Sequence, residues 1–294
     1  MTTRAVIRSA PVVAAPTARR VQAGRLAFRG IIHLFLIVAV VLALLPVLLT
    51  VQASFKTLYD FYDQPLGFPK VWAWRNYVQV WREARIPEYA RNSAIVTGVS
   101  VPLIVALSAL AAHGLTRYRF AANKYLYVYF LAGLLVPVQL TILPTLFQLK
   151  TLKLVNTHAG LIVTYVALGL PFSVFLMTGF MRTLPRELAE AAQLDGAGEF
   201  RAFWDVLLPL IRPAIATIAI LNGVTIWNEF FVALILAPDV PTLQVGVNNL
   251  RGYYSTEWGY IFAGVTLAAL PVLIAYWLLT KQFIRGLSAG ALKG

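Results

Sequence analysis

The 294-residue sequence contains no cysteine and has little charge. Without cysteine, neither a disulfide nor a cysteine-ligated metal site can form. Charged residues make up 13% of the chain, about half of the roughly 25% found in soluble domains. Hydrophobic residues make up 59% of it. This composition excludes an ordinary soluble core and favours a protein that spans a membrane.

The sequence also lacks the patterns that carry catalysis or nucleotide binding. There is no phosphate-binding loop of the form Gly, four residues, Gly-Lys-Ser/Thr. The three histidines lie at the ends of apolar runs, and no pair of histidines or carboxylates has metal-ligand spacing on one helix face. We therefore expect no catalytic residue, no metal site and no cofactor bound by this chain, which should not hydrolyse ATP alone.

Six long apolar runs dominate the chain. A spanning helix needs about 20 mostly apolar residues, whereas the strands of a membrane barrel alternate apolar and polar positions. The runs are continuously apolar, so the predicted fold class is an all-α polytopic membrane protein with six transmembrane helices. The runs are Gly30–Val51, Asn92–Leu115, Lys124–Thr145, Gly160–Phe180, Pro213–Ala237 and Gly259–Phe283.

Small residues and prolines in these runs indicate a tight bundle. The second run is rich in Ser, Thr, Gly and Ala, which allow helices to approach closely in lipid. Pro137, Pro171 and Pro271 lie near the middle of three other runs. Proline removes a backbone donor and frees a carbonyl that neighbours must satisfy. We expect kinked helices at these three places.

The net charge of +13 is better explained by topology than by nucleic-acid binding. With the N-terminus inside, 16 of the 25 Lys and Arg residues fall in cytoplasmic segments, and short basic flanks stay cytoplasmic. Both termini are therefore predicted to be cytoplasmic. Residues 1–28 show no apolar period and are predicted to be a disordered tail, with residues 29–294 as the membrane domain. A cleaved signal peptide is the alternative, but the first apolar run is longer than a signal requires.

The segment 182–212 interrupts this pattern on the predicted cytoplasmic face. It holds four basic and five acidic residues, so its charge is near neutral. Arg201–Asp205 and Arg186–Glu190 have the i, i+4 spacing of helical ion pairs. Gly196 fits the left-handed position that ends a helix. The segment is predicted to be a helix, a glycine turn and a second helix, and its residues alone allow either a surface hairpin or a docking site for a partner.

The second helix has an apolar period. Phe200, Phe203, Trp204, Leu207 and Leu208 recur at i, i+3, i+4, i+7 and i+8, which predicts that they share one helical face.

The stretch EAAQLDGAGEFRAFWDVLLP resembles the signature loop of ATP-binding-cassette importer permeases. The signature has Glu-Ala-Ala, then Gly, an aliphatic residue and Leu-Pro at fixed spacing, which Glu190, Gly196, Val206 and Pro209 match in this chain. Other segments, among them VPVQLTILPTLFQLKTLKLVNTHAGLI and IWNEFFVALIL, resemble the carbohydrate branch and the smaller permease of maltose-type pairs. The resemblance covers residues 30–294.

This resemblance implies a complex in the inner membrane of a bacterium or archaeon. The partners would be a second permease in a heterodimer, two ATPase subunits that hold ATP and Mg, and an extracytoplasmic binding protein that delivers a sugar. By the resemblance, residues 290–294 would contact the ATPases, and the loop would couple ATP hydrolysis to transport. Its coupling residues would be Glu190, Ala191, Ala192, Asp195, Gly196, Ala197, Leu208 and Pro209.

A polar stripe in the fifth apolar run is the candidate transport pathway. Asn222, Thr225 and Glu229 stand at i, i+3 and i+7, and Asn228 flanks them. Ionisable groups within a span tend to face the bundle interior, where they line a path or bond a neighbouring helix. Both interpretations of the stripe are open from the sequence.

Three other functions compete with sugar import. An importer permease for a polar non-sugar solute would share the loop. An ion-coupled secondary transporter would explain Glu229 but not the near-neutral loop, and such carriers often show two related halves, which we do not find. A membrane subunit without substrate, such as an insertase, is the third.

Overall fold

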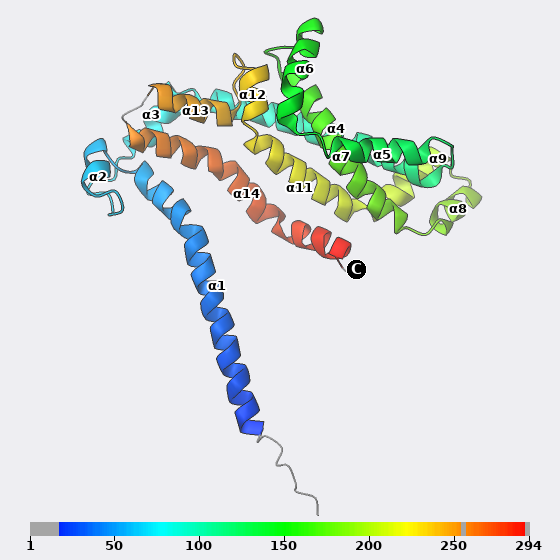
Figure 1. The fold of residues 1–294 in the computed structure, drawn as a ribbon, viewed down its shortest axis with the longest axis horizontal. Helices are drawn as coiled ribbons and strands as arrows, with labels where there is room; N and C mark the ends of the chain where they lie inside the picture. Colours follow the sequence, from blue (N-terminus) through cyan, green and yellow to red (C-terminus); the bar gives the residue numbers. More distant parts are fainter. Residues whose placement is uncertain (1–17, 254–256, 292–294) are drawn as a thin grey trace, which may run out of the picture. The chain divides into compact units, whose positions relative to one another are not determined.

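The computed structural model describes residues 18–253 and 257–291, and the side chains of residues 28–252 and 257–278 (Figure 1). The described residues form helices and no strand. The chain divides into two units, which meet in the sequence between Thr50 and Val51.

The first unit contains α1 (Ala18–Ser54) up to Thr50, and the end of this helix belongs to the second unit. The helix holds a candidate span of 27 residues from Phe28. Its leucine, valine and phenylalanine side chains are exposed along its length, as in Phe35 and Leu48. A helix that is apolar on all sides is typical of a membrane span. The helix begins at Ala18, inside the predicted tail, because Ala, Arg, Leu and Gln favour helix. Residues 1–17 lie outside the described residues.

The second unit is organised around four helices: α4 (Ile86–Arg117), α7 (His158–Arg182), α11 (Arg212–Asn228) and α14 (Trp258–Ala291). The most extensive helix–helix packing is between α4 and α7. Ser93, Ser100, Ser108 and Ala112 of α4 are all buried. Small side chains of this kind let two backbones approach closely, which confirms the packing expected from the composition of this run.

Three shorter helices surround the start of α14: α2 (Leu58–Asp63), α3 (Arg75–Glu83) and α13 (Leu243–Tyr253). Lys56 lies in the short link between α1 and α2 and is 1% exposed. Its Nζ donates to the carbonyl oxygens of Gln64 at 2.6 Å and Pro65 at 2.8 Å. Burial lowers the pKa of Lys56, and the Asp60 carboxylate opposes this shift. The lysine thus ties the link before α2 to the loop that follows α2.

The third predicted run is two helices rather than one kinked span. α5 (Asn123–Gly133) and α6 (Val138–Thr151) meet at an angle of 102°. Pro137 is the N-cap of α6 and has an extended ψ of 132°, so the chain leaves helical geometry before it. Proline suits a helix start because it lacks the N–H that an interior position would need. In contrast, Pro171 and Pro271 lie inside the continuous helices α7 and α14.

The fifth predicted run is also broken. α11 ends at Asn228, Glu229 is extended with ψ 129°, and α12 (Phe231–Leu236) follows. Among the residues that the structure describes, four helices are long and apolar enough to cross a membrane, and up to six spans result if each of two bent pairs counts as one. The second bent pair joins residues 199–210 to α11 at 74°. The all-α membrane fold is confirmed, while the number of six spans stays a prediction.

Segments predicted to share one side of the membrane lie together. The Tyr118 hydroxyl, just beyond α4, donates to the Glu199 carboxylate of the interrupting segment. At the opposite end of α4, Asn92 donates to the Pro241 carbonyl at 3.0 Å and its Oδ1 lies 3.0 Å from His158 Nε2. These contacts agree with the predicted alternation of sides, and the orientation relative to the cell stays a prediction.

Candidate functional site

The interrupting segment begins with α8 (Glu187–Leu194), which ends in a glycine turn. Gly196 has φ +86°. Its N–H donates to the Gln193 carbonyl at 3.0 Å, and the Ala197 N–H donates to the Ala192 carbonyl at 3.0 Å. These two bonds form the Schellman motif that closes a helix through a left-handed residue. The sequence-based prediction of a left-handed Gly196 is confirmed.

The second arm of the segment consists of α9 (Glu199–Arg201), the π-helical turn η1 (Ala202–Leu207) and α10 (Leu208–Leu210). Phe203 and Leu207 are buried, but Phe200 is 72% and Trp204 58% exposed. The residues predicted to share one helical face are therefore divided between buried and exposed side chains. The π turn over Ala202–Leu207 closes i→i+5 bonds and changes the helical period, and the pair Phe200 and Trp204 lies on a different side from the buried pair Phe203 and Leu207.

The exposed rings of Phe200 and Trp204 stack on each other, with centroids 6.2 Å apart and planes at 16°. Next to them, the predicted ion pair forms between Arg201 Nε and Asp205 Oδ2 at 3.2 Å. Leu194, just before the glycine turn, is 89% exposed. The segment therefore presents apolar side chains to its surroundings, a feature that the apolar period did not reveal.

The predicted coupling residues form the outer part of this segment. Glu190 and Ala191 are exposed on α8, and Asp195 and Gly196 are exposed at its turn. The remaining four are partly exposed: Ala192, Ala197, Leu208 and Pro209. Residues 292–294 of the predicted C-terminal contact lie outside the described residues, as do the side chains of residues 290 and 291.

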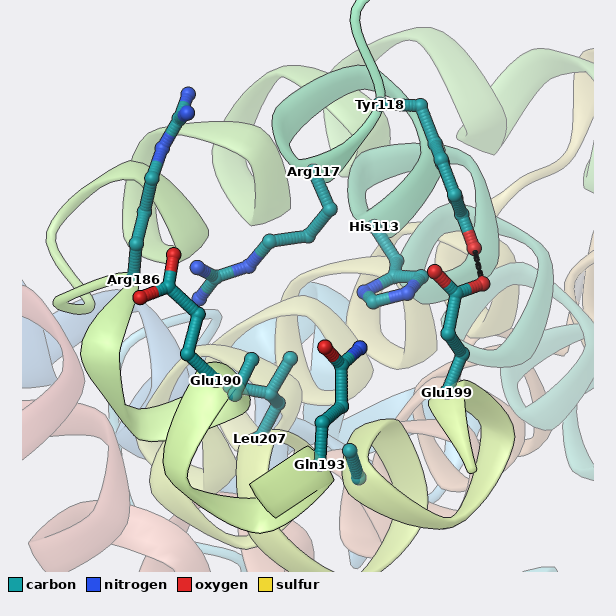
Figure 2. Close-up of a pocket in the computed structure, with 10 residues that line it drawn as sticks. His113, Arg117, Tyr118, Arg186, Glu190, Gln193, Glu199 and Leu207 are labelled. Carbon is teal, nitrogen blue, oxygen red and sulfur yellow. Dashed lines mark hydrogen bonds between the residues drawn. The ribbon is translucent and has the colours of Figure 1, made fainter. Parts of the chain in front are cut away.

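A pocket of about 230 Å³ lies between this segment and the end of α4 (Figure 2). On one side Phe203 packs against the ring of His113, with centroids 4.7 Å apart. The hydrogen bond to Glu199 raises the pKa of the Tyr118 hydroxyl. The lining residues are His113, Arg117, Tyr118, Arg186, Ala189, Glu190, Gln193, Glu199, Ala202 and Leu207.

A larger cavity of about 520 Å³ lies where the two broken runs meet. Its volume is within the range of roughly 300–1,000 Å³ that is typical of small-molecule sites. The cavity holds three of the four predicted pathway residues: Asn222, Thr225 and Glu229. Aromatic and aliphatic side chains of α7, including Phe172 and Leu168, supply much of the rest of the wall.

Glu229 lies in the cavity wall and also at the break that follows α11. Its Oε1 accepts from the Val232 N–H at 2.9 Å, and its Oε2 accepts from the Ala233 N–H at 3.1 Å and from the Tyr165 hydroxyl at 2.8 Å. A carboxylate is favourable at a helix N-terminus because the first amides there lack helical partners. Glu229 thus caps α12 instead of standing in mid-helix, as the uninterrupted run had suggested.

The other polar residues of the stripe differ in their surroundings. Asn222 Nδ2 donates to Ser173 Oγ at 3.0 Å and to the Ile218 carbonyl at 2.9 Å, so the residue links α11 to α7. Thr225 is exposed in the cavity wall. Asn228 is outside the lining, and its Nδ2 donates to the Val224 carbonyl. Hydrogen bonds to α7 therefore explain why Asn222 and Glu229 are tolerated in an apolar run, while the pathway role of the stripe stays a prediction.

Comparison with known proteins decides the family. Residues 104–287 match the model of the binding-protein-dependent transport system inner membrane component. The chain belongs to this family. It is therefore a multi-pass inner-membrane permease, the membrane component of a transport system and not an enzyme by itself.

Curated relatives agree along most of the permease. It is 36% identical over 270 residues to the diacetylchitobiose uptake system permease protein NgcG of Streptomyces coelicolor, covering 90% of this chain and 89% of that protein. It is 33% identical to the melibiose/raffinose/stachyose import permease protein MelC of Bacillus subtilis, covering 85% and 91%. It is 32% identical to the trehalose/maltose transport system permease protein MalG of Thermococcus litoralis, covering 88% and 94%.

The fold of the permease also matches a solved structure. A chain of a bacterial ABC transporter involved in the import of the acidic polysaccharide alginate superposes with a TM-score of 0.77. The match covers 92% of this chain and 99% of that one, at 20% sequence identity. At this identity the likeness concerns the fold alone.

Sequence reasoning missed two features of the permease that the structure places at these sites. Tyr165 binds Glu229 and lines the cavity, but a tyrosine in an apolar run gives no signal of its partner. Arg117 lines the pocket behind the interrupting segment, although the sequence assigns it only to a basic cytoplasmic flank. Its place at the very end of a span next to another loop could not be read without the fold.

Proposed function

We propose that this permease is one of the two membrane subunits of an ATP-driven sugar importer in a bacterial or archaeal inner membrane. A second permease completes the pathway, two ATP-binding-cassette ATPases bind ATP and Mg on the cytoplasmic side, and an external binding protein delivers the sugar. In this arrangement both termini and the segment 182–212 face the cytoplasm.

The observation that carries the proposal is the shape of that segment. An isolated membrane protein has no reason to expose Leu194, Phe200 and Trp204 at the end of a helical bundle. Exposed apolar patches of this kind are typical of docking sites. Here they surround a turn fixed by Gly196, in the stretch that carries the importer signature. The segment 182–212 would give an ATPase on the cytoplasmic face a protruding surface through which to push on the membrane helices.

The sugar path is assigned to the cavity at the two broken runs. Sugars are bound by hydrogen bonds to their hydroxyls and by apolar contact with their ring faces. The cavity offers both, since the exposed Thr225 hydroxyl lies in a wall that also contains Phe172. Relatives named for diacetylchitobiose, melibiose, raffinose, trehalose or maltose transport support a sugar as the solute.

Reconstitution tests the proposal. The permease would be co-purified with its ATPase and second permease, placed in liposomes with ATP inside, and supplied with the binding protein and labelled di- and trisaccharides. We expect uptake that needs ATP and binding protein and persists when an ionophore collapses the proton gradient. Uptake that stops with the gradient while ATP remains would identify a secondary transporter. Uptake of a polar non-sugar solute in place of every sugar tested would refute the substrate class alone.

A further inference from the structure

The turn between α4 and α5 borders an open pocket of about 550 Å³. Asn123 fixes this turn, because its Nδ2 donates to the carbonyl oxygens of Leu115 and Tyr118, each at 3.0 Å. Arg119 and Lys124 lie on either side of the bonded stretch and are exposed. The backbone positions of the two cations are therefore set by the turn, and both side chains line the same pocket.

The pocket is positively charged. Three of the side chains that line it are cationic, those of Arg119, Lys124 and Arg186, and none is a carboxylate. Within the described residues, none of the three forms an ion pair. The carboxylates of Glu190 and Glu199 line the neighbouring pocket of about 230 Å³ instead. Like charges gathered without a counter-charge repel one another, so a bound anion would stabilise this pocket.

Lys124 occupies a position that is unfavourable for a cation. It lies in the first turn of α5, which contains no acidic residue, and no side chain caps this end of the helix. The free amides at a helix start carry partial positive charge, so a cation there is destabilising and an anion is stabilising. A basic topology signal requires Lys or Arg in the flank of a span but not at this position. An anion in the pocket would offset the repulsion.

The same end of α5 has the features of a membrane surface. Tyr125 and Tyr129 are 76% and 74% exposed, and tyrosine is enriched at the level of the lipid headgroups. One turn beyond Lys124, the Arg182 guanidinium lies over the Tyr127 ring, 4.8 Å from its centroid. Cations and exposed tyrosines thus lie together at the start of a helix that belongs to a candidate span.

We propose that this pocket binds the headgroup of an anionic phospholipid, with Arg119 and Lys124 as the phosphate ligands. In the predicted orientation the lipid belongs to the cytoplasmic leaflet, whose anionic headgroups bind to basic pockets between membrane helices. Phe120 lies between the two cations in the sequence, lines the pocket and is 43% exposed, so it can contact the apolar part of the lipid. A soluble anion would have no use for this apolar surface. The proposal is independent of the solute that the permease transports.

The first experiment counts bound lipid. The permease complex would be purified in detergent, mixed with equal amounts of phosphatidylglycerol and phosphatidylcholine, and examined by native mass spectrometry. Each Lys or Arg near an anionic headgroup strengthens binding about five-fold. The double variant Arg119→Gln/Lys124→Gln should therefore bind phosphatidylglycerol at this pocket roughly 30-fold more weakly and lose a retained molecule. The exchange variant Arg119→Lys/Lys124→Arg keeps both charges and should retain it.

A matched control removes the same charge at another place. Lys150 and Lys153 are exposed lysines at and just beyond the end of α6, which forms the bent pair with α5. Lys150→Gln/Lys153→Gln should retain phosphatidylglycerol as the unmodified complex does. Full retention in Arg119→Gln/Lys124→Gln would show that the pocket does not bind the lipid. An equal loss in both double variants would assign the effect to total charge and would also overturn the proposal.

The second experiment separates a lipid from a soluble anion by the melting temperature of the complex in detergent. Phosphatidylglycerol should raise this temperature for the unmodified complex and not for Arg119→Gln/Lys124→Gln, whereas inorganic phosphate should raise neither. Without lipid, the double variant should melt at the same or a higher temperature, because the cations no longer repel each other. A rise with inorganic phosphate as large as that with lipid, or a lower melting temperature of the lipid-free variant, would contradict the proposal. Sugar uptake with ATP by the unmodified complex would leave the proposed function standing in either case.

Discussion

The replacement of Gly196 by alanine or by tryptophan tests the coupling role most directly. Gly196 is in the left-handed region, with φ +86°, and a Cβ built on it has no other atom within 4 Å. Both replacements therefore introduce the same backbone strain, and the Cβ atom that they share meets no other atom of this chain. They differ only in the volume that they place in front of the turn, where an ATPase would dock.

The magnitudes separate the two effects. A side chain in the left-handed region costs about 1–2 kcal/mol, a factor of roughly 5 to 30 in the population of the turn. Gly196→Ala should therefore reduce coupled uptake by no more than that factor. Gly196→Trp adds a side chain that would cover roughly 150–250 Å² at a contact. We expect it to abolish uptake, because the docking surface can no longer close.

The assay measures binding-protein-stimulated ATP hydrolysis and sugar uptake in liposomes, both normalised to assembled complex. Gly198 provides the control, because it has an ordinary φ of −64° and also has open space around its Cβ position. Gly198→Ala should behave as the unmodified complex does. If Gly196→Ala and Gly196→Trp have equal effects, strain alone explains them. Full activity in Gly196→Trp would refute the assignment of the turn to ATPase docking.

Three further predictions concern the pathway, the topology and the external loop. Glu229→Gln should lower the stability of the complex by about 1–3 kcal/mol, since it removes an acceptor for buried donors, whereas Thr225→Ala should change sugar uptake at unchanged melting temperature. Leu194→Cys should resist an impermeant thiol reagent in intact cells and react in inverted vesicles, and Gln64→Cys should show the opposite pattern; the reverse result would overturn the predicted orientation. Lys56→Met should destabilise its loop by about 2 kcal/mol or more, because two carbonyl oxygens lose a charged donor, and faster proteolysis of that loop would report it.

The interrupting segment could be predicted well up to its glycine turn. The Schellman turn depends on local geometry alone, so Gly196 after a short amphipathic helix was sufficient to place it. The second arm was less predictable because a π turn has no clear sequence signal. The exposure of Phe200 and Trp204 depends on that turn and on which side the rest of the bundle occupies.

Hydropathy located the apolar runs but not the breaks within them. Pro137 lies between two helices and Pro171 lies inside one, although both are prolines within apolar runs. The difference lies in the neighbours. A Cβ on Gly133 would stand 2.8 Å from Pro171 Cγ, so the last residue of α5 packs closely against the proline of α7. Such a contact between residues 38 positions apart is a property of the folded bundle.

Glu229 was predicted in mid-helix for the same reason, because hydropathy does not show where an apolar run breaks. The difference matters for the interpretation of the cavity. In an uninterrupted helix, Asn222, Thr225 and Glu229 form one polar stripe. The carboxylate is the member of the stripe whose placement within a span costs the most free energy. In the structure the acid is occupied by two backbone amides and Tyr165, so the helix break and the carboxylate stabilise each other. A carboxylate with three donors has little capacity left for a solute. The part of the stripe that remains available to a sugar is Thr225, and the specificity of this cavity should therefore depend on Thr225 and the apolar wall that faces it more than on the charge.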